Sequence, residues 1–360
     1  MVDDSATVRQ ALAAILGRER DMEVTIAADP VFALAKMERQ RPDVIVTDIE
    51  MPRMDGLTFL RRVMAIDPIP TLICSALTGM ATDTAILALE EGAIGVVTKP
   101  RLGVKEFLEE SALTLVDAVR GAAAARGGPW PRRRRTSVAS LPASDARRPA
   151  PSLTVTTQDV VAIGASTGGT EALRAILEEM PPECPGIVIV QHMPAGFTRA
   201  FAQRLDQTCR IEVKEAVDGD HVLEGRALIA PGDRHLRVRR TGAQYCVEVT
   251  GGPQVSRHRP SVDVLFSSAA QAVGPNAVGV LLTGMGDDGA QGLNEMKQAG
   301  AATIAQDEAS CVVFGMPREA ILLGAADEVV ALSEIPRRIL RLAGASPLRM
   351  ALAQQAVIGA

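Results

Sequence analysis

Aromatic residues are scarce in this sequence, and cysteines are few. Tryptophan occurs once, tyrosine once and phenylalanine seven times, so few flat side chains are available for stacking nucleic-acid bases. The five cysteines are widely separated and never form a C-x-x-C pair. This distribution favours buried thiols in a reducing compartment over disulfides or a zinc site. The net charge of −5 provides no overall attraction for nucleic acid or for an anionic membrane.

Long apolar runs are also missing. No segment has the basic start and apolar stretch of a secretory leader, and no uninterrupted apolar run is long enough to cross a bilayer. Hydrophobic residues make up 47% of the chain and charged residues 22%, which is typical of globular proteins. We therefore expect a cytoplasmic protein that does not insert into membranes, does not bind nucleic acid and is a monomer. Its 360 residues suffice for two domains.

One segment, residues 121–157, separates two halves of different content. It is rich in Gly, Pro, Ala, Ser and Arg and has no apolar period, so we predict a flexible linker. The run from Arg132 to Arg135 is more consistent with solvated linker charge than with a docking patch. The predicted organisation is a domain at 1–120, this linker, a domain at 158–346 and a tail at 347–360.

Both halves alternate short apolar runs with amphipathic segments of helical length. Such runs are typical of strands buried in parallel sheets. In the first half they lie at 23–28, 43–48, 70–75 and 93–99. In the second half they read "VVAIGA", "GIVIVQH", "ALIAPG", "VGVLLTG" and "AATIAQ". The pattern predicts two α/β domains with open parallel sheets and helices on both faces. Functional groups in such sheets gather at the carboxyl ends of the strands.

Acidic residues mark predicted strand ends in the first half. Asp3 and Asp4 precede the first helical segment, and Asp48 ends the run "DVIVTD". Acids clustered at one sheet edge repel one another unless a cation such as Mg²⁺ neutralises them. Ser75 and Lys99 follow two further runs and would complete a pocket for a phosphoryl group, with one carboxylate as nucleophile. The alternative, that an Asp merely caps a helix or turn, suits a single acid better than this ordered set.

The segments "VDDS", "DVIVTDIEMPRMDG", "CSALT" and "VVTKP", taken in order, resemble the receiver domain of two-component response regulators, which is flavodoxin-like. The resemblance implies that a histidine kinase transfers a phosphoryl group to Asp48. It also implies that Asp4, Asp48 and the backbone carbonyl of Glu50 hold Mg²⁺, while Asp3 helps through water.

The same resemblance implies that Ser75 and Lys99 contact the phosphoryl oxygens. Receivers begin with an apolar strand before the acid pair, whereas here only Met1 and Val2 precede Asp3. That strand is central in the flavodoxin-like order. We therefore expect the first strand to be missing from this sheet and the true start of the protein to lie upstream.

A glycine turn, "GASTGG", follows the first apolar run of the second half. It is neither a dinucleotide fingerprint, because Ser166 replaces the second glycine, nor a P-loop, because it has no lysine. It does match G-x-S-x-G, in which a serine is exposed on a sharp turn between a strand and a helix. A serine nucleophile also needs a base and an orienting acid.

Four histidines limit the candidates for the base. His192 ends the next apolar run, and consecutive parallel strands are usually neighbours, which places it on the same sheet edge as Ser166. His221 is predicted to be a surface residue. Asp287 and Asp288 follow the run "VGVLLTG", whose glycines would also turn backbone N–H groups toward an oxyanion. The order Ser…His…Asp differs from that of α/β-hydrolases and predicts another parallel architecture.

The segments "IGASTGGTEAL", "QHMPAGFT", "APGDRH", "RHRPSVDVLF" and "LLTGMGDDG" together resemble the catalytic domain of chemotaxis protein-glutamate methylesterases. The similarity covers roughly residues 158–345, and that family joins this domain to an N-terminal receiver. The resemblance implies a catalytic triad of Ser166, His192 and Asp288, with Asp287 at a variable position.

The resemblance further implies that the backbone amide of Met285 helps to bind the oxyanion and that Thr167 lies beside the nucleophile. His235, and His258 with its neighbouring arginines, are candidates for substrate contacts. The implied activity is phosphorylation-activated hydrolysis of glutamate γ-methyl esters, and deamidation of glutamines, on methylated chemoreceptors. The receiver would cover the site when unphosphorylated. No cofactor is implied in the catalytic domain, and Mg²⁺ is implied only in the receiver.

Three alternatives remain beside this interpretation. A receiver can be fused to a DNA-binding output, but that requires a basic domain with a helix-turn-helix, which the second half does not show. A catalytically silent module could bind a nucleotide at the glycine turn. A serine hydrolase for another class of ester would carry the same triad, and only the family motifs argue against it.

Overall fold

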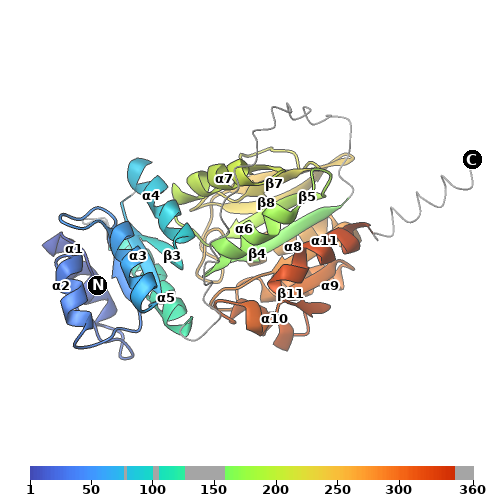
Figure 1. Ribbon diagram of the computed structural model, residues 1–360. Coiled ribbons are helices and arrows are strands. Elements are labelled where there is room, and N and C mark those ends of the chain that lie inside the picture. Colours follow the sequence, from blue (N-terminus) through green and yellow to red (C-terminus); the bar gives the residue numbers. More distant parts are fainter. Residues whose placement is uncertain (77–78, 100–104, 126–158, 345–360) are drawn as a thin grey trace, which may run out of the picture.

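The computed structural model describes residues 1–76, 79–99, 105–125 and 159–344, which form two α/β domains (Figure 1). The N-terminal domain has a parallel sheet in the order β1-β2-β3. Its strands are β1 (Ile45–Thr47), β2 (Thr71–Ser75) and β3 (Gly95–Thr98). Its helices are α1 (Ala6–Leu16), α2 (Pro30–Met37), α3 (Gly56–Ile66), α4 (Gly79–Glu90) and α5 (Lys105–Ala124). Ser5, Asp29 and Asp55 start α1, α2 and α3 because each side chain accepts a backbone N–H of the first turn.

The first residues of the chain lie inside this sheet. Val2 forms single parallel bridges with Ala27 on one side and Thr47 on the other. Among the described residues, the position between them is thus held by two isolated bridges at Val2 rather than by a strand. The prediction of a strand at 23–28 is wrong, because among the described residues only the short segment 1–3 lies beside it to pair with its backbone.

The C-terminal domain contains a seven-stranded parallel sheet in the order β12-β11-β10-β4-β5-β7-β6, which makes it doubly wound as predicted. Its strands are β4 (Val160–Ala165), β5 (Gly186–Gln191), β6 (Glu212–Glu215), β7 (Arg226–Ile229), β10 (Ala277–Leu281), β11 (Ala302–Gln306) and β12 (Glu328–Val330). The strand order reverses at β4, since β5 lies on one side and β10 on the other. A reversal of this kind opens a crevice at the carboxyl ends of the strands.

Helices cover both faces of this sheet because alternate strand residues point to opposite sides. Val161 and Ile163 pack in one apolar cluster with α6 (Gly169–Glu179), α7 (Phe197–Thr208) and α11 (Ile335–Gly344). Val160 and Ala162 pack in another with α8 (Val262–Ala272), α9 (Ala290–Gln298) and α10 (Met316–Leu322). The antiparallel ribbon of β8 (His235–Thr241) and β9 (Gln244–Thr250), which the sequence patterns did not predict, packs on α8.

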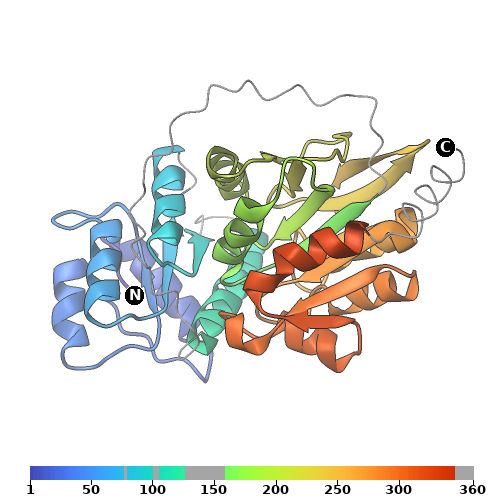
Figure 2. The same cartoon turned by 45° about the vertical axis from the view of Figure 1, so that its right-hand side comes forward.

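The two domains are in direct contact through α4 and α5 (Figures 1 and 2). Arg204 of α7 pairs with both carboxylate oxygens of Glu90 of α4, at 2.5 and 3.1 Å. The backbone N–H of Gly168 donates to the carbonyl of Ile94, at 3.3 Å. Apolar side chains of α4 and α7 belong to one continuous core. The N-terminal domain therefore lies over the carboxyl edge of the C-terminal sheet.

The predicted linker begins too early. Helix α5 continues to Ala124, and Gly121, Ala122 and Ala125 are buried, because small residues let this end of the helix pack closely. The remainder of the predicted linker, which includes the run from Arg132 to Arg135, and the predicted tail lie outside the described residues. Within the described ranges, no helix has both the length and the apolarity needed to span a bilayer.

Candidate active site

Ser166 lies in the tight turn between β4 and α6 and is half-buried. Its N–H donates to the carbonyl of Thr283 at 3.0 Å, and its own carbonyl accepts the N–H of Gly169 at 2.8 Å. Gly168 has φ = 78°, and a Cβ there would lie 2.5 Å from Cβ of Val312. Only glycine fits this position. The turn therefore holds the serine at the carboxyl end of the strand where the sheet order reverses.

His192 and Asp288 come from the loops that follow the two strands beside β4. Nε2 of His192 lies 2.8 Å from Oδ2 of Asp288. Asp288 is buried and accepts three more hydrogen bonds, from the Ser261 hydroxyl at 2.8 Å and from the backbone N–H groups of Val262 and Asp263 at 2.8 and 3.0 Å. Burial acts to raise the pKa of Asp288, but the hydrogen bonds outweigh it and lower this pKa to about 2. The carboxylate is thus ionised at neutral pH.

The second ring nitrogen of His192 is available for chemistry. Because Nε2 contacts Asp288, Nδ1 is the nitrogen that is not engaged by the acid. Nδ1 is buried and has no hydrogen-bond partner among the described residues. A buried imidazole nitrogen without a partner is costly unless it has a use. The geometry gives His192 an orienting acid on one side and an open basic nitrogen on the other.

His258 covers one face of the His192 ring. The two imidazoles stack with ring centroids 3.7 Å apart and planes 14° from parallel. Burial, together with the neighbouring His192 and Arg257, lowers the pKa of His258 to about 3, so it is neutral at physiological pH. His258, a candidate for a substrate contact, thus packs against the proposed base.

The other two histidines lie apart from the reacting groups. His235 is buried, with Nε2 2.9 Å from the carbonyl of Pro253 and Nδ1 accepting the N–H of Ser261 at 3.3 Å. The expectation that His235 contacts substrate is therefore wrong, since backbone groups occupy both of its nitrogens. His221 is exposed, in agreement with its prediction as a surface residue.

The loop that follows β10 presses against the serine turn. A Cβ at Gly284 would lie 2.7 Å from Cβ of Ser166, so this close approach requires glycine. Thr167 is tied to the loop because its carbonyl accepts the Thr283 hydroxyl at 3.0 Å. The backbone N–H of Met285 has no partner within the described part of the chain. Its predicted role as an oxyanion donor remains a prediction, and this placement supports it.

Two positioning residues escaped the sequence analysis. Gln191 is buried, and its Nε2 donates to the carbonyls of Ser166 and His192, at 2.9 and 3.2 Å. The hydroxyl of Ser261 donates a hydrogen bond to Oδ1 of Asp288. A buried glutamine at the end of the apolar run "IVIVQ" was the available signal, because a polar side chain in a buried strand needs hydrogen-bond partners. Ser261 offered no comparable signal, since a serine before a helix usually serves as its cap.

Ser166 and His192 line a cavity of about 460 Å³ to which both domains contribute. The C-terminal domain contributes Ser166, His192 and Met285, while β3 and α5 of the N-terminal domain form the opposite wall. Gly121 of α5 lies directly on the serine turn, since a Cβ there would lie 2.9 Å from Oγ1 of Thr167. In this arrangement the N-terminal domain covers the mouth of the site.

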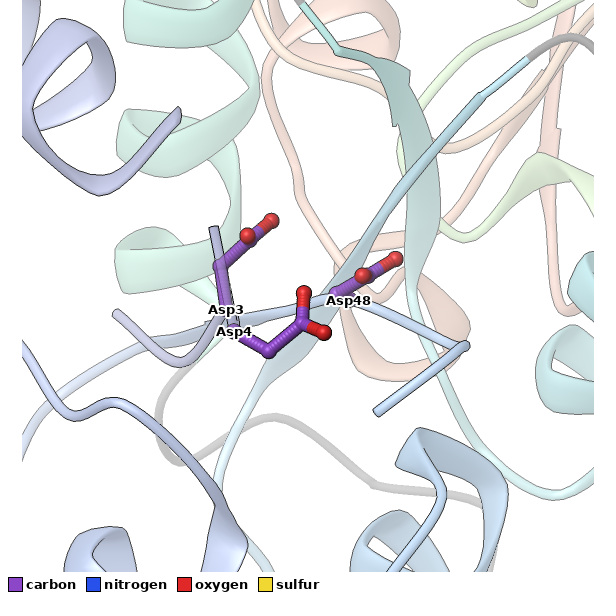
Figure 3. Close-up of side chains that lie close together, drawn as sticks. All are labelled: Asp3, Asp4 and Asp48. Carbon is purple, nitrogen blue, oxygen red and sulfur yellow. The ribbon is translucent and has the colours of Figure 1, made fainter. Parts of the chain in front are cut away.

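A second cluster lies in the N-terminal domain. Asp3, Asp4 and Asp48 converge at the end of β1, with carboxylate oxygens within 4.8 Å of one another (Figure 3). Lys99 lies 2.6 Å from Oδ2 of Asp48 and 3.0 Å from Oδ2 of Asp3. Burial raises the pKa of Asp48, and Lys99 opposes that shift. This donor set of hard oxygens fits Mg²⁺.

The remaining predicted switch residues lie at the same sheet edge. Ser75 is buried at the end of β2, and its carbonyl accepts the N–H of Lys99 at 3.0 Å. The Ser75 hydroxyl donates to the carbonyl of Ala76 at 3.2 Å. The predicted role of the Glu50 carbonyl as a metal ligand remains a prediction.

Comparison with known proteins relates both domains to one group of enzymes. Residues 161–339 match the family described as CheB methylesterase, and residues 1–111 match the response regulator receiver domain. The chain is 57% identical over 348 residues to "Protein-glutamate methylesterase/protein-glutamine glutaminase 3" of Geobacter metallireducens, covering 96% of this chain and 98% of that protein. It is 60% identical over 347 residues to "Protein-glutamate methylesterase/protein-glutamine glutaminase 5" of Anaeromyxobacter dehalogenans, covering 95% of each. The crystal structure of the Thermotoga maritima CheB methylesterase catalytic domain matches with a TM-score of 0.50 and 41% identity, over 51% of this chain and 98% of that one.

Proposed function

The chain belongs to the CheB family of protein-glutamate methylesterases/protein-glutamine glutaminases with a receiver domain, and we propose that Ser166, His192 and Asp288 carry out its hydrolysis. The proposed substrates are glutamate γ-methyl esters and glutamines on the cytoplasmic helices of chemoreceptors. The observation that carries this proposal is the contact of 2.8 Å between His192 and Asp288, at the sheet edge that also holds Ser166. Location in the cytoplasm and a monomeric state remain predictions.

The first half of the reaction forms an acyl-enzyme. Nδ1 of His192 accepts the proton of Ser166 as the serine oxygen attacks the ester carbonyl. Asp288 keeps the proton of Nε2 in place and stabilises the imidazolium. In the proposal the N–H of Met285 donates to the developing oxyanion, where a preorganised donor is worth a factor of about 10²–10³ in rate. His192 then gives its proton to the departing methoxide, and methanol leaves.

The second half of the reaction hydrolyses the acyl-enzyme and regenerates the free enzyme. A water molecule gives a proton to Nδ1 of His192 and attacks the acyl carbonyl. The ester bond to Ser166 breaks, and the proton on His192 returns to the serine oxygen. The carboxylic acid that forms releases its remaining proton to solvent, so a glutamate carboxylate remains. With glutamine as substrate the steps are the same, except that ammonia leaves in place of methanol. Either reaction adds one negative charge to the receptor helix, which is a local electrostatic switch.

The receiver regulates access to the site in this proposal. A chemotaxis histidine kinase phosphorylates Asp48, and the receiver then moves off the catalytic domain. Mg²⁺ held by Asp4, Asp48 and the Glu50 carbonyl, with Asp3 helping through water, would neutralise negative charge on the carboxylates and on the phosphoryl group. Ser75 and Lys99 would then contact the phosphoryl oxygens. A change at Asp48 alters the populations of the covered and open arrangements, and the difference in their stabilities sets the degree of activation.

Release of methanol from methylated receptor membranes tests the proposal. The native chain is compared with Ser166→Ala and Asp48→Ala, each with and without a small phosphodonor. We expect release to require Ser166 and to rise with the phosphodonor only when Asp48 is present. Release that persists in Ser166→Ala would refute the triad. Release that ignores the phosphodonor in the native chain would refute the regulatory part alone.

A further inference from the structure

Among the described residues, one arginine at the cavity forms its ion pair with the other domain rather than within its own. The charged side chains that line the cavity, apart from its histidines, are Asp117, Arg120, Asp233, Arg257 and Arg259. Arg259 pairs with Asp233 within the catalytic domain, and Arg120 pairs with acids of the receiver. Among the described residues, the ion pair of Arg257 is with Asp117 on α5 of the receiver, at 3.6 Å. Arg257 is 57% exposed. In the proposed open arrangement, this guanidinium would lose Asp117 as its partner.

The backbone of the turn that carries Arg257 is strained. Ser256 and Arg257 have φ values of 50° and 65°, a region that residues with a Cβ seldom adopt. Two backbone hydrogen bonds between Val255 and His258 close the turn, and the Ser256 hydroxyl bonds to Asp263 at 3.1 Å. Residues other than glycine that are held in the left-handed backbone conformation occur most often at functional sites. The strained turn places Arg257 directly beside His258, which stacks on the proposed base.

We propose that Arg257 is a carboxylate-binding subsite that recognises an acidic side chain of the receptor helix beside the reacting glutamate. Asp117 of the receiver occupies this subsite in the covered arrangement. The inference rests on the proposed function and adds to it a determinant of substrate choice. It also assigns to Asp117 the role of a carboxylate that competes with the substrate.

The charge of the substrate explains why a carboxylate-binding subsite would be useful. The reacting side chain is a neutral ester or amide, so its own charge cannot select it among the glutamates of the receptor. On a helix, side chains three or four residues apart lie about 5–6 Å from each other, so an acidic neighbour reaches the rim while the ester reaches Ser166. Guanidinium groups bind carboxylates with two parallel hydrogen bonds and are the residue type suited to this task.

The test compares two substrates with one enzyme. The full chain, activated with a small phosphodonor, hydrolyses methylated receptor membranes and the small neutral ester 4-nitrophenyl acetate. Arg257→Gln is expected to lower the ratio of kcat/KM for receptor to kcat/KM for the small ester by about tenfold, the effect of losing one charge-assisted contact. It should also weaken the dependence of receptor hydrolysis on salt. The matched control is Arg239→Gln, because Arg239 is an exposed arginine of β8 that pairs with Glu248 outside the cavity. In this control the ratio of the two kcat/KM values should stay unchanged.

The outcomes separate this inference from the function on which it rests. An equal loss on both substrates would mean that Arg257 only supports the turn beside His258, and an unchanged ratio would mean that it binds no carboxylate. Either result overturns the inference. If Ser166→Ala retained activity on the receptor, the proposed function itself would fail.

A second arm tests Asp117 without the phosphodonor. Asp117→Asn should raise receptor hydrolysis about two- to threefold, because it removes a partly exposed ion pair from the covered arrangement. The same change in an Arg257→Gln background should have no further effect, since the partner is already absent. The control is Glu38→Gln, an exposed acid just after α2. Equal effects of Asp117→Asn in both backgrounds would refute the pairing.

Discussion

Gly121 provides a direct test of the covered arrangement. This residue lies near the end of α5, where an added Cβ would lie 2.9 Å from Oγ1 of Thr167 and 3.5 Å from Cβ of Met285. Ordinary contacts between non-bonded heavy atoms lie at about 3.5 Å or more. Thr167 is β-branched and has few other rotamers to adopt. The change Gly121→Ala therefore forces α5 to retreat from the serine turn.

The structure sets the expected size of the effect. Forcing one extra carbon into a packed contact costs about 1–3 kcal/mol. That cost falls only on the covered arrangement, so the ratio of open to covered molecules should rise about 5- to 150-fold. Alanine is also a better helix former than glycine by about 0.5–1 kcal/mol, so the receiver itself should not lose stability. Gly121→Leu should open the site further.

The assay is methanol release from receptor membranes without a phosphodonor. Basal release should rise severalfold in Gly121→Ala, up to the rate of the phosphorylated native chain, and stimulation by the phosphodonor should shrink in proportion. Ala123→Ser serves as the control, because Ala123 is an exposed residue of the same helix. If basal release and stimulation both stayed at native values while the receiver remained folded, the covering of Ser166 by α5 would be refuted.

Three further predictions concern the acids. Asp288→Asn should lower kcat for receptor demethylation by about 10³–10⁴-fold, because an amide cannot hold the His192 proton or stabilise its charge; a loss below tenfold would contradict the triad. Burial and the charge of Asp288 raise the pKa of Asp263 to about 6, above its unfolded value, so its ionisation opposes folding. Stability from Asp263 is present below about pH 4 and is lost as the pH rises through 6, so Asp263→Asn should raise Tm at pH 8 and leave Tm nearly unchanged at pH 4; equal shifts at both would exclude this cause. Removal of Mg²⁺ with a chelator should abolish stimulation by the phosphodonor in the native chain but leave the unstimulated methanol release intact, whereas an equal loss of both would place a metal requirement in the catalytic domain.

Sequence motifs and hydrophobic periodicity were sufficient to predict much of the fold. The continuous apolar runs of the second half became β4, β5, β7, β10 and β11, because a run flanked by turns and long enough for one strand has few other structures available. The strands that were missed are short or exposed. The edge strand β12 has only three residues, and β8 alternates with arginines on its outer face. Neither carries the apolar signal of a buried strand.

The sequence by itself determined which residues could react. Ser166 in its glycine turn, His192 after an apolar run and the acids after "VGVLLTG" could be identified because strand ends of a parallel sheet share one edge. Tertiary structure decided how they are arranged: Nε2 of His192 contacts Asp288 while Nδ1 has no hydrogen-bond partner among the described residues, His258 stacks on the His192 ring while His235 bonds to the backbone, and α5 lines the cavity that Ser166 also lines. These facts depend on ring orientation and on contacts between segments far apart in the chain, and local periodicity carries no information about either.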